Sequence, residues 1–120
     1  MLPPVFQTLK ASQAIKDIVG TNPPRIYRHG RAPQDTSQPY ITWFLVAGTP
    51  ENNLSDPSPV GRKSVQIDCW HQTDKGIEEL ADAVRDALEP VAHITQEGDD
   101  EQERDTKLFR FRFETDFWGR

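Results

Sequence analysis

The sequence predicts an α+β fold, a mixed, mainly antiparallel sheet of about four strands with one long helix and short N-terminal helices packed on it. In residues 63–89, apolar side chains first alternate with polar ones and then recur every three or four positions, which predicts a strand followed by a helix. In residues 107–118, phenylalanine alternates with polar and charged residues, which predicts a second strand. The 120 residues have the length of a single domain, residues 1–120.

The N-terminal part is expected to be helical. Residues 4–19 show two short apolar faces, so they predict two short helices or one kinked helix. Ser12 can cap a second helix, and Gly20 can end it in a left-handed conformation. Residues 21–39 are rich in Pro, Gly, Asn and Ser and are expected to be mostly loop, with a short edge strand at 25–27.

A strand and a long arm are expected in the middle of the chain. Residues 40–47 are β-branched and aromatic, which favours a strand. Residues 48–62 are rich in Pro, Gly, Asn and Ser and are too long for an ordinary hairpin loop. They are expected to form a flexible arm, which is either a functional contact loop or disordered.

The central strand and helix supply most of the expected core. The strand directs Val65, Ile67 and Cys69 to one face, and Thr73 or Asp74 can cap the helix that follows. The helix is expected to end before a proline. Its apolar stripe consists of Ile77, Leu80, Ala81, Val84 and Leu88.

The C-terminal part is expected to hold one weak and one strong strand. Residues 91–96 are a weak strand candidate, and residues 97–105 carry so many acids that they predict a solvated turn. Residues 107–118 form the strong strand, whose apolar face must meet the helices. That face carries Phe109, Phe111, Phe113, Thr115 and Phe117.

Charge and composition disfavour several classes of function. The chain has 14 Lys and Arg against 19 Asp and Glu, a net charge of −5, which argues against sequence-specific nucleic-acid binding. A single cysteine cannot form an internal disulfide, and no segment reaches the roughly 20 apolar residues of a membrane helix. The N-terminus lacks a basic flank and a long apolar run, so we expect a cytoplasmic protein without export or membrane contact.

No catalytic, metal or cofactor site is expected. Cys69 and His71 could form a nucleophile–base pair, but Cys69 shares the parity of the core residues and is expected to be structural. His29, His71 and His93 lack the spacing of zinc ligands. The acidic run at 97–105 lacks the pattern of a calcium loop.

Two tryptophans lie on strand faces that are otherwise polar. Trp70 is opposite in parity to Cys69, and Trp118 is opposite to the phenylalanine face of its own strand. Amphipathic aromatics on a polar face are typical of interfaces. The alternative is that the N-terminal helices or the arm at 48–62 cover them.

The chain resembles the tail-completion proteins (tail-terminator or tail-to-head joining proteins) of long-tailed bacteriophages over most of its length. The resemblance depends on the order and spacing of short segments. These are Asp17-Ile18-Val19-Gly20, Arg25-Ile26-Tyr27, the loop Gly30–Gln34, Pro39-Tyr40-Ile41, the strand Val65–Trp70, the helix segment Leu80–Leu88 and the strand Phe109–Phe113.

The resemblance implies a structural virion role without an active site. Such proteins form a ring, typically hexameric, on the head-proximal end of the tail tube, assembled in the bacterial host. The ring stops tube polymerisation and joins the tail to the head, so the partners are the tube protein and a neck protein. Candidate subunit or partner contacts are Arg31, Asn52, Asn53, Leu54, Asp56, Trp70 and Trp118.

Two alternatives to a tail terminator stay open. One is a head-completion or neck subunit, which belongs to the same virion class. The other is a small acidic protein-binding module of the inhibitor type, which would use its negative surface. A ring subunit should oligomerise or join tails, whereas an inhibitor should be a monomer with one tight partner.

Overall fold

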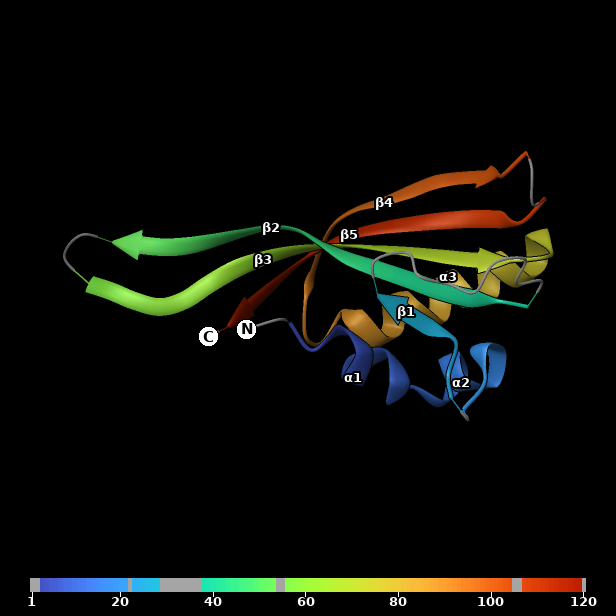
Figure 1. Ribbon diagram of the computed structural model, residues 1–120, viewed down its shortest axis with the longest axis horizontal. Helices are drawn as coiled ribbons and strands as arrows, with labels where there is room; N and C mark the ends of the chain where they lie inside the picture. The colour runs from blue at the N-terminus through green and yellow to red at the C-terminus, as the bar shows by residue number, and fades with distance from the viewer. Residues whose placement is uncertain (1–2, 22, 29–37, 54–55, 105–106, 120) are drawn as a thin grey trace.

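The computed structural model describes residues 3–21, 23–28, 38–53, 56–104 and 107–119 (Figure 1). Within these ranges the chain forms an α+β fold, as the sequence predicts. Its elements, in chain order, are α1 (Val5–Lys10), α2 (Gln13–Val19), β1 (Ile26–Arg28), β2 (Tyr40–Asn53), β3 (Asp56–His71), α3 (Asp74–Leu88), β4 (His93–Gln102) and β5 (Phe109–Gly119).

The described strands form one five-stranded sheet in the order β1-β2-β3-β5-β4. The pair β1–β2 is parallel, and the pairs β2–β3, β3–β5 and β4–β5 are antiparallel, so the mixed, mainly antiparallel arrangement is confirmed. The expected number of about four strands was too low by one. Strands β1 and β4 are the two edges of the sheet.

The helices α1, α2 and α3 lie on the same side of the sheet (Figure 1). Helix α3 packs on β3 and β5, and α1 and α2 pack on α3. The predicted strand face and helix stripe both belong to this core. The side chains that are fully excluded from solvent include Ile41, Ile67, Cys69, Leu80, Val84, Leu88 and Phe113.

The predicted helix ends are confirmed by their capping bonds. Ser12 Oγ accepts a hydrogen bond from the Ile15 amide at 3.3 Å, and Thr73 Oγ1 accepts one from the Gly76 amide at 2.9 Å. Of the two proposed caps for α3, Thr73 is therefore the one used. Gly20 follows α2 as predicted, but its φ of +90° and ψ of 171° are not the expected left-handed helical conformation. Its positive φ would still strain a side chain.

Gly76 in the first turn of α3 lies against the ring of His71. A Cβ on Gly76 would lie within about 2.0 Å of the His71 ring, and the His71 Nδ1 atom accepts a hydrogen bond from the Thr73 amide at 3.1 Å. Burial lowers the pKa of His71, and Glu79 opposes that shift. The His71 ring therefore occupies the space that a side chain at position 76 would need.

Gly76→Ala is expected to lower the melting temperature, although alanine in a helix normally stabilises by about 0.5–1 kcal/mol relative to glycine. In a His71→Ala background, the same change is expected to raise the melting temperature, because the clash is gone. Thermal unfolding of the two single variants and the double variant measures this coupling. A stabilising Gly76→Ala in the presence of His71 would contradict the contact.

In its described parts, residues 48–53 and 56–62, the arm is not a loop. Its backbone continues β2 and β3 as a two-stranded antiparallel ribbon, in which Gly48 pairs with Lys63 and Asn53 pairs with Asp56. The register shifts between Pro50 and Asn52, which places an irregularity in the ribbon. The prolines fit because, among the described strands, none other than β2 and β3 lies beside most of the ribbon, so few ladder bonds are lost.

The acidic segment is a strand rather than the expected turn as far as Gln102. It belongs to β4, which pairs with β5 and lies at the sheet edge. Glu97 and Glu101 each form an ion pair there, with Arg85 of α3 and Arg110 of β5. Asp100 of β4 is exposed at this edge, so its charge stays in water.

Candidate assembly surface

The sheet face opposite the helices is polar and aromatic. Strand register aligns four side chains across it, and we call them the cross-sheet row: Tyr40 of β2, Trp70 of β3, Arg110 of β5 and Glu101 of β4. Each member stands opposite the next on the neighbouring strand, and directly opposed side chains on one face interact. Trp70, which is predicted to lie at an interface, therefore stands between Tyr40 and Arg110 in the cross-sheet row.

The cross-sheet row is held by ring and charge contacts. The Tyr40 and Trp70 rings stack with centroids 5.7 Å apart and an interplanar angle of 14°. The Arg110 guanidinium lies 5.9 Å from the Trp70 ring centroid, and an Arg110 nitrogen lies 2.6 Å from a Glu101 oxygen. Tyr27 of β1 extends the aromatic part, with its ring centroid 6.2 Å from that of Tyr40.

The row is partly shielded from water. Burial raises the pKa of Tyr40, and the negative charge of Glu103 and the neighbouring Tyr27 raise it further. The Trp70 indole N–H donates a hydrogen bond to Thr42 Oγ1 at 3.2 Å, and Thr42 is only 6% exposed although the described helices lie on the other side of the sheet. The indole nitrogen is thus satisfied within the subunit, and the half-buried ring surface is what Trp70 can offer to a partner.

Apolar surface continues toward the arm. Val46 is the extra residue of a β-bulge in β2. Its side chain is 55% exposed, slightly more than that of Val91 at 50%. Isolated exposed valines are normal, but this one lies at the base of the ribbon. No pattern within β2 predicts this exposure, because a bulge depends on the pairing of two strands.

The other predicted contact residues are spread widely. Asn52, Asn53 and Asp56 lie near the far end of the ribbon, where Asn52 pairs with Pro57. Leu54 and Arg31 lie outside the described residues. Trp118 pairs with Arg62 in the register, eight positions from Arg110, or roughly 27 Å along the strand. The predicted contacts therefore do not form one compact patch.

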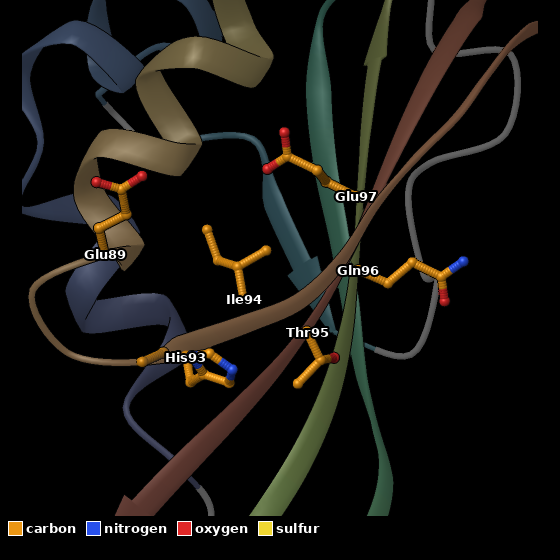
Figure 2. Close-up of a pocket in the computed structure, with 7 residues that line it drawn as sticks. Glu89, His93, Ile94, Thr95, Gln96 and Glu97 are labelled. Carbon is orange, nitrogen blue, oxygen red and sulfur yellow. The ribbon is translucent and has the colours of Figure 1, made fainter.

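A shallow hollow lies where α3 passes into β4 (Figure 2). Its volume is about 450 Å³, and the side chain of Ile94 points into the space between β4 and α3. Glu89 and His93 lie at its rim (Figure 2). Among the residues that the structure describes, no group of three His, Cys, Asp or Glu side chains could hold a metal ion, here or elsewhere.

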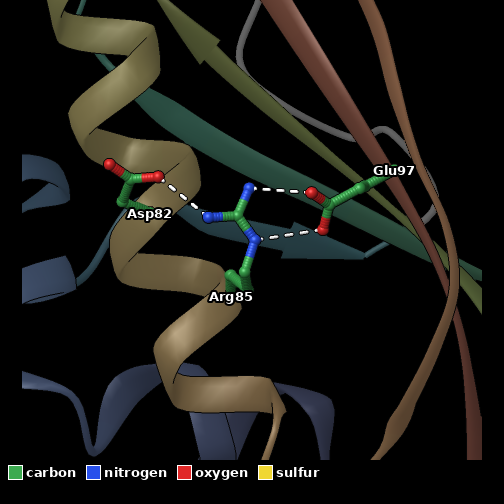
Figure 3. Close-up of polar contacts among 3 residues, drawn as sticks. All are labelled: Asp82, Arg85 and Glu97. Carbon is green, nitrogen blue, oxygen red and sulfur yellow. Dashed lines mark hydrogen bonds and ion pairs between the residues drawn. The ribbon is translucent and has the colours of Figure 1, made fainter.

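One ion-pair cluster ties α3 to β4 (Figure 3). The Arg85 guanidinium donates to both carboxylate oxygens of Glu97, at 2.9 and 3.0 Å, and to Asp82 at 2.9 Å. These bonds, with Glu97 foremost, raise the pKa of Arg85. A bidentate pair fixes geometry more firmly than a single contact, so the cluster orients the acidic strand relative to the helix.

Cys69 is fully buried in the core, as its parity predicts. Burial, with the nearby charge of Asp68, raises the pKa of its thiol far above the ordinary range. A thiol that is both inaccessible and protonated is a poor nucleophile. The geometry therefore gives no support to the alternative of a catalytic Cys69–His71 pair, and His71 accepts a hydrogen bond from the Thr73 amide at the start of α3.

Cys69→Ala is expected to lower the free energy of unfolding by about 1 kcal/mol and to leave assembly intact. In the native protein, the thiol is expected to react with a maleimide only at the rate of unfolding. Labelling followed by mass spectrometry, with a urea-unfolded sample as the reference, measures both rates. Labelling of the native protein as fast as of the unfolded one would contradict burial.

The comparisons with known proteins agree with this architecture. A family model described as tail completion protein gp17 matches residues 3–119. The chain belongs to this family of tail completion proteins. It is thus a structural phage protein, as the sequence resemblance implies.

A solved structure has the same fold as this tail completion protein. A chain from the virion of a native gene transfer agent particle superposes with a TM-score of 0.67 at 15% identity, covering 95% of this chain and 90% of the other. At that identity the likeness concerns the fold alone. No curated protein matches the sequence. Within the described ranges, no helix is long and apolar enough to cross a membrane.

Proposed function

We propose that this tail completion protein is a tail terminator. Six copies form a closed ring on the head-proximal end of the tail tube, stop tube polymerisation and offer a surface to the neck of the head. The ring contacts the tube protein on one side and a head-completion protein on the other. The role needs no catalysis, which is consistent with the buried Cys69.

The β2–β3 ribbon carries the proposal. It extends beyond the helices at one end of the molecule, whose longest dimension is 51 Å against 28 and 23 Å for the others (Figure 1). A two-stranded ribbon on its own is marginally stable in water. The ribbon therefore stands to gain stability by packing on another molecule, as expected for a subunit of an assembly.

The open sheet face supports the same role. Its cross-sheet row presents a half-buried tryptophan and a tyrosine among charged side chains. Aromatic anchors surrounded by polar groups are common at protein interfaces. The virion likeness, which concerns the fold, is compatible with a place in a particle.

The test is deletion of the gene in its phage and electron microscopy of the lysate. We expect tails of uncontrolled length that fail to join heads, with both defects reversed by the wild-type gene. Trp70→Ala is expected to reduce joined particles about tenfold if the ring surface of Trp70 is a hot spot. Asp86→Lys, on an exposed part of α3, is the matched control and should complement fully.

The length of the tails separates the proposal from its alternatives. Tails of normal length that remain unjoined would favour a head-completion or neck subunit. Joined tails of normal length in the deletion would refute a tail-terminator role. A small inhibitor would leave both tail length and joining unchanged.

A further inference from the structure

The two edges of the sheet carry opposite charge. Residues 1–34 contain five Lys and Arg against one Asp, a net charge of +4, whereas residues 74–105 contain twelve Asp and Glu against three Lys and Arg, a net charge of −9. The first segment leads through α2 into edge strand β1, and the second runs from α3 into edge strand β4. The chain is therefore polarised across the sheet.

The β4 side forms a groove with acidic walls. A hollow of about 400 Å³ between α3 and the strands β4 and β5 has a floor of Ile77, Ala81 and Phe111. Its only cation, among the residues that line it, is Arg85, which is already bonded to Asp82 and Glu97. We call the carboxylates that line this groove the acidic edge: Asp74, Glu78, Asp82 and Asp100.

The β1 side is basic. Lys16 of α2 and Arg28 of β1, with Arg25 between these elements, form what we call the basic edge. Arg25 bonds the backbone carbonyls of Ile18 and Pro39, and Arg28 lies 5.6 Å from the Trp43 ring centroid. Within the described ranges, none of these three cations forms an ion pair with a carboxylate.

The strands that carry Arg28 and Asp100 are far apart in one subunit. Four strand spacings of about 4.8 Å, or roughly 19 Å, separate β1 from β4, which exceeds the Debye length of about 8 Å at physiological salt. These two charges are therefore largely screened from each other within a copy. Both edge strands have one side without a described neighbour, which leaves backbone groups open to another chain.

We propose that the acidic edge of one copy binds the basic edge of the next, so that copies associate head to tail. The inference rests on the proposed ring function and names the surfaces that build the ring. A closed ring requires a heterologous interface, in which two different patches meet at every contact. Two edges of one sheet with opposite charge meet that requirement, whereas a self-complementary patch would stop at a dimer.

The test uses two charge-reversed variants on tail tubes isolated from the deletion phage. The acidic-edge variant is Glu78→Lys with Asp100→Lys, and the basic-edge variant is Lys16→Glu with Arg28→Glu. Both pairs remain compatible with folding, because the four side chains are exposed or half-buried and Arg25 with its backbone bonds is left in place. Melting temperatures check this point, and negative-stain electron microscopy counts capped tube ends.

Each variant alone is expected to cap tubes at least about tenfold less well than wild type, because its substituted positions then face like charges at every contact, and the edge that carries them loses its net charge or reverses it. An equal mixture is expected to recover capping, since every contact of an even-numbered ring of alternating copies then joins either two wild-type edges or two edges whose substituted positions carry opposite charges. Wild-type capping should weaken as salt rises. The control, Glu79→Lys with Asp86→Lys, makes the same charge change on exposed positions of α3 that do not line the groove.

The outcomes separate the two proposals. If wild type and both variants cap equally well, the edge pairing is wrong and the ring function stands. If the variants fail and the mixture also fails, the edges matter but do not bind each other, which overturns the inference as well. If wild type itself does not cap tubes, the ring function falls and the edge pairing falls with it.

Discussion

Phe113→Ala is expected to lower the free energy of unfolding by about 3–5 kcal/mol. Phe113 has no exposed surface, its ring centroid lies 5.1 Å from that of Phe111, and it pairs with Ile67 in the register. Removing the ring would leave a cavity where β3, β5 and α3 meet. Because domains of this size are stable by about 5–15 kcal/mol, the variant would be close to unfolding at 37 °C.

Urea unfolding followed by tryptophan fluorescence measures the loss for Phe113. Phe109→Ala is the matched control, since it removes the same side chain on the same strand face but from a partly buried position. It is expected to cost less than half as much as Phe113→Ala. Equal costs for the two variants would show that the core is not centred on Phe113.

Removal of the ribbon is expected to abolish tube capping while leaving the body folded. The variant replaces residues 50–61 with Asn-Gly, a pair that favours the two-residue hairpin turn between Thr49 and Arg62. Strand β5 pairs with β3 from Gly61 onward, so Gly61 is the only deleted residue that lies beside a described strand other than β2 and β3. The melting temperature should therefore change by only a few degrees, whereas capped tube ends should fall at least about tenfold.

A second variant tests whether length or side chains matter in the ribbon. Asn52→Ala with Asn53→Ala keeps the ribbon but removes two amides near its end. If the ribbon contacts its partner through these amides, this variant should also lose capping. Wild-type capping by the shortened protein, at an unchanged melting temperature, would exclude the ribbon as an assembly element.

Much of the body could be predicted because its signals are local. The alternation through Val65, Ile67 and Cys69 has the period of a strand, and the stripe from Ile77 to Leu88 has that of a helix. Each pattern can be recognised from the residues of its own segment alone. Capping by Ser12 and Thr73 is equally local, because the cap bonds amides three residues away.

The errors arose where a distant partner determines the structure. Residues 48–62 have the composition of a loop, yet each half of the segment finds its hydrogen-bond partners in the other half. The acidic residues of β4 disfavour a strand by themselves, yet Arg85 and Arg110 supply the opposite charges. The composition of a single segment predicts neither the strand pairing within the ribbon nor the ion pairs of β4.

The sequence by itself determined the α+β class, the buried faces of β3, β5 and α3, and membership of the tail completion family. Tertiary structure decided which polar surfaces face each other. It aligned Tyr40, Trp70, Arg110 and Glu101 in one row, and it placed the basic N-terminal segment and the acidic segment of β4 on opposite sheet edges. The physical reason is that strand order and register depend on contacts between residues far apart in the chain, which the period of a single segment does not encode.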